Sequence, residues 1–124
     1  MSTKTIKVGI LSWDKYQQRT LAIARGEFKP KPGDPKIYFP SLKSAGEILS
    51  EKNLELLRVI ATRKPASISE LAPMVHRAQP NLTRTLRKME QYGLIDMVPE
   101  GKAIRPVAKA KKVHFEAEFN LAAA

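Results

Sequence analysis

Basic and amide side chains gather in one short stretch of the sequence. From Arg77 to Lys88 the chain reads RAQPNLTRTLRK, which holds four full positive charges and no acidic residue. An arginine can bridge O6 and N7 of guanine, and asparagine or glutamine can bridge N6 and N7 of adenine. Lysine and arginine also bind phosphate oxygens, which position a protein on DNA without reading its sequence. These residue types predict contacts with both the bases and the backbone of a nucleic acid.

A solvated helix face is the alternative for this stretch, because surface helices commonly carry lysine and arginine. Such faces usually intersperse acids that pair with basic residues one turn away, and here no acid follows until Glu90. The missing acids favour the nucleic-acid interpretation. Within it, Arg87 and Lys88 are expected to contact the DNA backbone. The residues expected to read bases are Gln79, Asn81, Thr83 and Arg84, with Arg77 at the entry to their helix.

Local patterns predict the helices that hold these residues. We expect helices over residues 51–64, 69–76 and 80–92. Ser69 is expected to open the second helix, and Pro80 suits the first position of the third because its missing N–H is not needed there. Leu82, Leu86 and Met89 repeat at helical spacing. The third helix should therefore turn these three side chains inward and its basic side chains outward.

A β-hairpin is expected to follow the third helix. Gly93 is a natural stop for that helix, and residues 94–99 and 102–108 flank the turn Glu100-Gly101. Two helices across a short turn followed by such a hairpin are typical of a winged helix-turn-helix. Lys102 and Arg105 would give the hairpin basic contacts with DNA, or would serve as charges that keep an edge strand from aggregating. The next basic residues are expected either to contact phosphates or to form a solvated connector; they are Lys109, Lys111 and Lys112.

The stretch SISELAPMVHRAQPNLTRTLRKMEQYGLIDMV resembles the second helix, recognition helix and first wing strand of MarR-type winged-helix regulators. That family usually carries a small polar residue, an arginine and a Leu-Glu-x-x-Gly-Leu-Ile ending. Here Thr83, Arg84 and MEQYGLI stand at those places, with Met89 instead of leucine. The resemblance covers about residues 50–108 and implies a DNA-binding fold. The leading segment RTLAIARGEFKPKPGDPKIYF differs from that family's long dimerisation helix and is more similar to small prokaryotic DNA-binding proteins, some of them antitoxin-like.

Alternating patterns predict a strand on each side of the helical region. In residues 4–11, Ile6, Val8 and Ile10 fall on one side of an extended chain, and residues 113–119 alternate in the same way. Between them we expect a helix over 13–25, a linker with four prolines over 29–40 and a helix over 42–49. The two outer strands are expected to form or complete a sheet, and a two-fold axis between copies is one arrangement that would do so.

The predicted fold class is α+β, mainly α with small β elements: a winged helix-turn-helix with extra N- and C-terminal strands. Residues 1–49 are interpreted as an N-terminal extension for dimerisation or partner binding. Residues 50–108 form the predicted DNA-binding domain, and 109–124 a C-terminal strand and tail. A chain of 124 residues is close to the size of one domain, so we expect one core with appended segments.

Composition narrows the function classes. The chain has no cysteine, which excludes a disulfide, a thiolate zinc site and a cysteine nucleophile. His76 and His114 are isolated, so we predict no catalytic residue, no metal site and no cofactor. The net charge of +10 favours a polyanionic partner. Lys4 and Lys7 interrupt the first apolar stretch, and no run reaches the roughly 18 apolar residues of a membrane span; we expect a cytoplasmic protein without a membrane partner.

These observations lead to one preferred function and two alternatives. The preferred prediction is a sequence-specific double-stranded DNA-binding regulator of transcription, a repressor that acts as a homodimer. One alternative is an antitoxin that binds a toxin protein and represses its own operon. The other is a general nucleic-acid-binding protein. Outside the winged region, an aromatic cluster is expected to pack in the core or to form a ligand pocket or partner surface; its members are Trp13, Tyr16, Tyr38 and Phe39.

Overall fold

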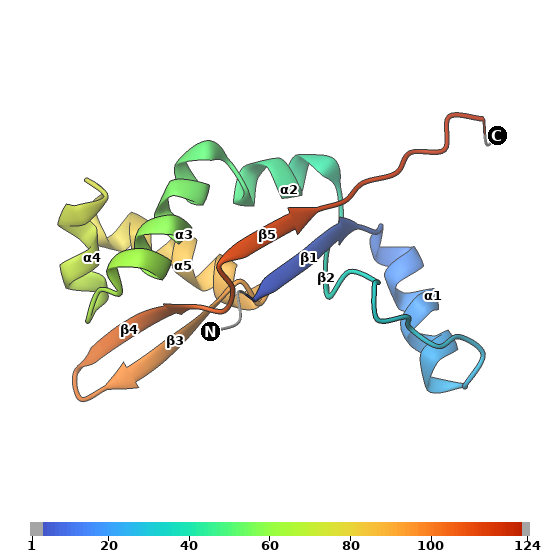
Figure 1. Cartoon of the computed structure of the whole chain (residues 1–124), viewed down its shortest axis with the longest axis horizontal. Helices are drawn as coiled ribbons and strands as arrows, with labels where there is room; N and C mark the ends of the chain where they lie inside the picture. The colour runs from blue at the N-terminus through green and yellow to red at the C-terminus, as the bar shows by residue number, and fades with distance from the viewer. Residues whose placement is uncertain (1–3, 123–124) are drawn as a thin grey trace.

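The computed structural model describes residues 4–122 (Figure 1). Within this range five helices and five strands follow one another along the chain, so the fold is of the α+β class. The elements are β1 (Thr5–Ile10), α1 (Trp13–Ala24), β2 (Ile37–Phe39), α2 (Leu42–Ile48), α3 (Glu51–Arg63), α4 (Ile68–Met74), α5 (Gln79–Gln91), β3 (Ile95–Glu100), β4 (Ala103–Ala108) and β5 (Lys112–Phe115).

A parallel sheet joins the two ends of the described chain. Its strand order is β2-β1-β5, with β1 in the centre. Thr5 of β1 is opposite Lys112 of β5, and Val8 is opposite both Ile37 of β2 and Phe115 of β5. Ile6 and Val8 are buried, as the alternating pattern predicts. The sheet that the sequence predicted from the two outer strands therefore forms within one chain.

The linker predicted over residues 29–40 contains a strand that sequence reasoning missed. Residues 37–39 form β2, and hydrogen bonds on either side extend the pairing: the Lys36 amide donates to the Lys7 carbonyl over 3.0 Å and the Leu11 amide to the Phe39 carbonyl over 2.9 Å. The neighbouring prolines cannot donate such bonds, which confines the strand to three residues. So short a strand has no pattern of its own, because only its pairing with β1 defines it.

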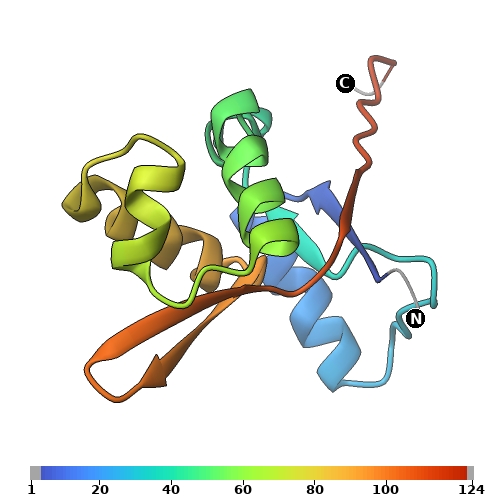
Figure 2. The ribbon, with the colours of Figure 1, turned by 60° about the vertical axis from the view of Figure 1, so that its left-hand side comes forward.

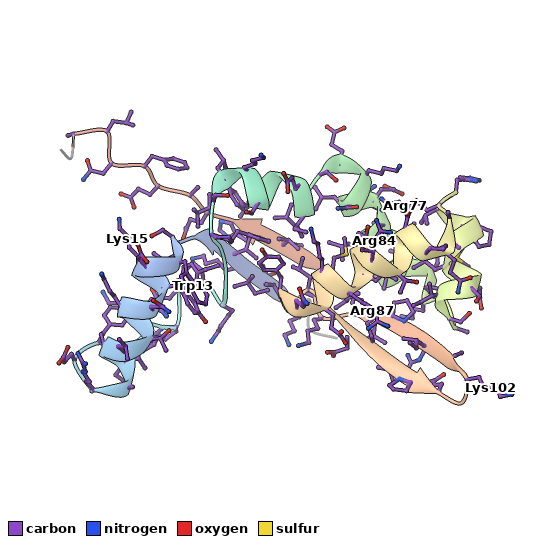
Figure 3. The ribbon with its side chains drawn as sticks, turned by 180° about the vertical axis from the view of Figure 1, so that it is seen from behind. Trp13, Lys15, Arg77, Arg84, Arg87 and Lys102 are labelled. Carbon is purple, nitrogen blue, oxygen red and sulfur yellow. The ribbon has the colours of Figure 1, made fainter. Side chains whose placement is uncertain are left out.

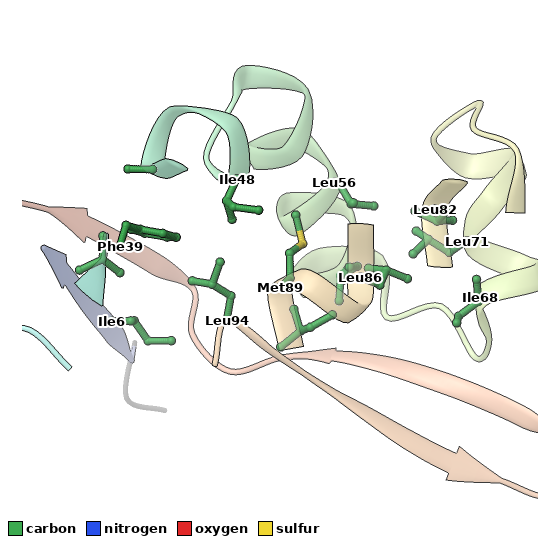
Figure 4. Packing of buried hydrophobic residues seen from close by; sticks show 14 residues of the cluster. Ile6, Phe39, Ile48, Leu56, Ile68, Leu71, Leu82, Leu86, Met89 and Leu94 are labelled. Atoms are coloured by element: carbon green, nitrogen blue, oxygen red, sulfur yellow. The ribbon is translucent and has the colours of Figure 1, made fainter. Parts of the chain in front are cut away.

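The last three helices pack around one hydrophobic core (Figure 4). Leu82, Leu86 and Met89 of α5 are fully buried, which confirms their predicted inward face. They meet residues from both neighbouring helices, Leu56 and Ile60 of α3 and Ile68 and Leu71 of α4. Each such buried side chain stabilises the fold by about 1.5–3 kcal/mol relative to an exposed one. The core therefore fixes how α5 is held and which of its faces is left to solvent.

The same core continues into the parallel sheet. Ile6 and Val8 of β1 and Phe39 of β2 belong to one hydrophobic cluster with Ile48 of α2 and the buried residues of α5. Phe39 also packs against Tyr92, with ring centroids 4.6 Å apart. The predicted single core is therefore present in the described residues. The domain boundaries drawn at 49/50 and 108/109 stay predictions.

The helix α4 begins earlier than its sequence suggests. Ser67, and not Ser69, is its N-cap: the Ser67 hydroxyl accepts a hydrogen bond from the Glu70 amide over 3.0 Å. Glu70 Oε2 in turn accepts from the Ala66 amide over 3.3 Å. These two bonds satisfy amides that a helix start leaves without partners, so α4 starts at Ile68.

A two-stranded antiparallel hairpin follows α5. Gly93 has φ +83°, a left-handed conformation that ends the helix and turns the chain into β3. Leu94 and Ile95 are buried and anchor the base of the hairpin in the core. The tip turns at Gly101, whose φ is +61°. Pro106 in the middle of β4 is also fully buried, and Ile104 packs against the core, so the tip of the hairpin is its freest part (Figure 2).

The last predicted strand is shorter than its alternating pattern suggests. β5 ends at Phe115 instead of residue 119, and the Glu116 amide makes the last bond of the chain to the sheet, with the Val8 carbonyl over 2.9 Å. The following residues run away from the helices in an extended path (Figures 1 and 2). A strand needs a partner for its backbone groups, and no described residue pairs with 117–122.

Candidate nucleic-acid interface

The outward face of α5 carries basic side chains that have no acidic partner. Arg84, Arg87 and Lys88 are exposed, and none of them forms an ion pair with any residue between 4 and 122. Five cations outside α5 do have such partners in the described chain: Lys7, Arg19, Arg58, Arg105 and Lys109 each form an ion pair. Figure 3 shows Arg84 and Arg87 on the side of α5 that faces away from α3. This cationic face therefore keeps its full charge available to a ligand.

Polar residues predicted to read bases lie at the start of the same helix. Gln79 and Asn81 are exposed, and Gln79 Oε1 accepts a hydrogen bond from the Ser69 hydroxyl over 3.3 Å. Thr83 is half-buried, and its hydroxyl donates to the Gln79 carbonyl over 2.9 Å. This bond uses the hydroxyl hydrogen and leaves the hydroxyl oxygen as an acceptor beside the methyl group. The cap residue, Ala78, offers no side-chain bond to the first amides of the helix.

Arg77 differs from these residues, because it is half-buried and bonded within the fold. Its predicted contact with DNA stays a prediction. Its Nη1 donates to Asn53 Oδ1 over 3.1 Å, and its Nη2 donates to the Lys52 carbonyl over 2.9 Å. Both acceptors belong to the first turn of α3, so the guanidinium ties the α4–α5 turn to that helix. Arg77 Nε is buried and has no hydrogen-bond partner within residues 4–122. We therefore leave Arg77 outside the candidate interface.

The turn between α4 and α5 depends on an unusual backbone conformation. His76 has φ +54°, in the left-handed region that few non-glycine residues adopt. Its amide donates to the Pro73 carbonyl over 3.4 Å, and the Arg77 amide donates to the Ala72 carbonyl over 3.1 Å. These bonds close the end of α4 and let the chain reverse within a few residues.

The described residues contain no group of three histidine, cysteine, aspartate or glutamate side chains that could hold a metal ion.

The hairpin contributes one cation at its tip and holds another in place. Lys102 lies in the tip turn, is exposed and has no acidic partner in the part of the chain that the structure describes (Figure 3). Arg105 is different, because its Nε donates to Glu100 Oε1 over 2.8 Å across the hairpin. An exposed pair of this kind contributes about 0–1 kcal/mol, so it can open. Lys109 Nζ lies 3.5 Å from Asp96 Oδ1, which makes a second ion pair on the same hairpin.

The predicted aromatic cluster is divided between the surface and the core. Trp13 and Tyr16 stack with ring centroids 6.1 Å apart, and Tyr38 meets Tyr16 edge-on at 6.3 Å. Trp13 is 65% exposed, so core packing does not account for it. Phe39, in contrast, is fully buried.

No helix within residues 4–122 has the length and apolar character to cross a membrane.

Comparison with known proteins places the central region in a family. The family model HVO_A0114 matches residues 48–115, which is more than half of the chain. The matched region runs from the end of α2 through the helices and the hairpin to the last residue of β5. No curated protein and no solved structure gives a significant match. The resemblance to MarR-type regulators stays a prediction. On the extent of the match, the chain belongs to the HVO_A0114 family.

Proposed function

We propose that the chain is a winged helix-turn-helix protein that binds double-stranded DNA, with α5 in the major groove and the β3–β4 hairpin as the wing. The order of the elements supports this proposal. A short turn joins α4 to α5, and a hairpin follows α5 after Gly93. In winged helix-turn-helix proteins the second helix of such a pair reads the major groove. In this chain that helix is also the one with a buried apolar face and an open cationic face.

The observation that carries the proposal is the unpaired charge on α5. Arg84 lies one turn from both Arg87 and Lys88 on an exposed face, and like charges at this spacing repel one another by a few tenths of a kcal/mol per pair. Phosphate groups would relieve that repulsion and release condensed counterions. A solvated face without function has no physical reason to avoid acids, since acids would stabilise it.

The proposed contacts divide into two classes. Arg84, Asn81 and Gln79 read base edges, because they are exposed on the first half of α5. Gln79 does so with its amide nitrogen, or gives up the bond that its Oε1 accepts from Ser69. Arg87 and Lys88 on the next turn contact phosphates, and Lys102 contacts the backbone from the tip of the wing. Arg105 joins them only when its pair with Glu100 opens. The uncapped amides at the start of α5 can donate hydrogen bonds to a phosphate in the field of the helix dipole.

In the cell we propose that the protein is a repressor that occupies a promoter. Two copies would set two α5 helices in successive major grooves, roughly 34 Å apart, which doubles the contact area. The antitoxin function stays a prediction, as does a general nucleic-acid-binding role. These alternatives differ in one measurable quantity, the ratio of specific to non-specific affinity.

Selection of bound duplexes from a random pool at physiological salt tests the proposal. We expect a palindromic motif, and Arg84→Ala should weaken binding to that motif by about 1–3 kcal/mol and relax the preference at one base pair. Arg58→Ala is the matched control, because it removes the same charge from the exposed side of α3, where Arg58 pairs with Glu55. Recovery of no motif, with binding that depends only on salt, would replace the proposal with a general nucleic-acid-binding role.

A further inference from the structure

The segment after β5 has the pattern of a strand but no strand to pair with. We call residues 116–122 the arm. All of its residues are exposed, including Phe119 at 57% and Leu121 at 95%. These two side chains continue the alternation of Val113 and Phe115, while Glu116 and Glu118 fall on the other side. Large apolar side chains held in water are costly, by about 25 cal/mol for each Å², so this side of the arm is suited to a partner.

An apolar groove lies beside the strand from which the arm departs. The edge groove, about 270 Å³ in volume, runs between α2 and β5, and its lining includes Leu42, Leu49, Leu54, Val113 and Phe115. A second hollow of about 560 Å³ continues it along α3, sharing Leu54 and Val113. β5 is also the outer strand of the sheet, so it presents unpaired backbone groups next to the groove. The groove and the strand edge together form a site for one more strand with an apolar side.

The arm cannot reach this site in its own chain. It leaves β5 in the direction in which the strand runs, away from the helices (Figure 1). To lie along β5 it would have to reverse directly after Phe115, where the sequence is Glu-Ala-Glu. Tight hairpin turns need glycine, asparagine or aspartate at positions with positive φ, and these residues are absent there. The occupant must therefore come from another molecule.

We propose that two copies of the chain exchange their arms, each laying its arm antiparallel along the β5 edge of the other. Phe119 and Leu121 would enter the partner's edge groove, because they lie on the same side of the extended chain as Phe115, which lines it. Backbone bonds along the edge of β5 would add the affinity typical of strand addition. The added strand would cover the edge of β5, whose unpaired backbone groups could otherwise pair with other chains and cause aggregation.

Charge favours a second copy as the occupant. Glu116 lies on the open face of the sheet, where its Oε2 is 3.5 Å from Lys7 Nζ. Glu118 falls on the same side of the arm, and the receiving β5 presents Lys112 and His114 on that face, since these two residues alternate with Val113 and Phe115. An acidic arm thus meets a basic strand, on a chain whose net charge of +10 otherwise opposes its association with itself.

Sedimentation equilibrium of the full chain without DNA tests the exchange. We expect a mass of twice 13.9 kDa at micromolar concentration. The double variant Phe119→Glu, Leu121→Glu should sediment as a monomer and keep the helical circular dichroism spectrum of the wild type, because both side chains are exposed in their own chain. Its thermal midpoint should fall, since the stabilisation that dimerisation gives is lost. Leu21→Glu is the control, since it makes one such replacement at an apolar, 52% exposed site on α1 and should leave the dimer intact. A monomeric wild-type protein, or a dimer that the double variant preserves, overturns the proposal.

Disulfide trapping identifies the contact itself, because the natural chain has no cysteine. Mild oxidation of a mixture of Leu54→Cys and Phe119→Cys proteins should give a cross-linked pair. The mixture of Leu21→Cys and Phe119→Cys should give only the background that collisions produce. Equal yields in the two mixtures would overturn the exchange. Neither experiment touches α5, so the exchange and the proposed DNA binding can fail separately.

Discussion

Arg77 and Arg84 belong to one basic stretch, yet the fold gives them different surroundings. The guanidinium of Arg77 donates two hydrogen bonds to the first turn of α3. Arg84 lies within α5 and is exposed, and it forms no ion pair in the described chain. A charged group bound within the fold contributes to stability, whereas one that is left free contributes to ligand binding. The two residues should therefore respond differently to the same substitution.

We predict that Arg77→Ala lowers the free energy of unfolding by about 1–2 kcal/mol, because hydrogen bonds to a charged group are stronger than neutral ones. Arg84→Ala should change it by less than about 0.5 kcal/mol, as exposed substitutions usually do. Urea denaturation of the two variants measures both values. Equal losses would mean that the bonds of Arg77 to Asn53 and Lys52 contribute nothing.

Residue-level inference from the sequence succeeded where the signal is local. Leu82, Leu86 and Met89 are buried as predicted, because their spacing of three and four residues is itself the property that places them on one face. The role of Arg77 was missed because its acceptor Asn53 lies in another helix. No spacing rule connects two residues whose contact arises from the packing of α3 against the α4–α5 turn.

At the scale of elements, helix starts depend on which side chain reaches an open amide. Each of the first four helices has a serine at its N-cap, namely Ser12, Ser41, Ser50 and Ser67. The helix α5 lacks such a bond at Ala78. The one helix start without a side-chain acceptor is thus the one proposed to face DNA phosphates.

Replacement of Ser67 by alanine should cost about 1 kcal/mol of stability, because it removes the acceptor for the Glu70 amide. Ser69→Ala is the matched control: Ser69 is exposed within α4, and its hydroxyl contacts only Gln79 Oε1 over 3.3 Å. Thermal or urea unfolding compares the two. A larger loss from Ser69→Ala would restore the helix start that the sequence alone predicted.

Strands were harder to predict than helices, for a physical reason. The alternation in residues 113–119 is real, but β5 stops at Phe115, opposite Val8, where the chain leaves β1 although β1 itself continues to Ile10. β2 has only three residues, in a segment bounded by Pro35 and Pro40, and is defined by β1, which lies far earlier in the chain. A helix makes its hydrogen bonds within itself, whereas a strand is complete only when a distant segment arrives beside it.

At the scale of the whole molecule, charge and shape combine. The net charge of +10 is carried by a body from which the hairpin extends at one end and α1 at the other (Figure 3). Lys102 lies at the tip of the hairpin, and Lys15 lies on α1. A charge that touches DNA contributes to its salt dependence, whereas a remote one is screened within roughly 8–10 Å at physiological ionic strength.

Lys102→Ala should therefore weaken binding to all duplex sequences alike and lower the slope of log affinity against log salt by about 1. Lys15→Ala removes the same charge at the other end and should leave the slope unchanged. Titrations of one duplex at several salt concentrations give both slopes. An identical decrease for both variants would show that net charge, and not the wing, determines the salt dependence.

The central position of β1 has a consequence for how the protein is made. Thr5 pairs with Lys112, so the middle strand of the sheet leaves the ribosome long before one of its two neighbours exists. The helices and the hairpin hold mostly local contacts and can fold first, since short loops close at low entropic cost. During synthesis β1 has one side open, and the sheet closes only as the last strand emerges.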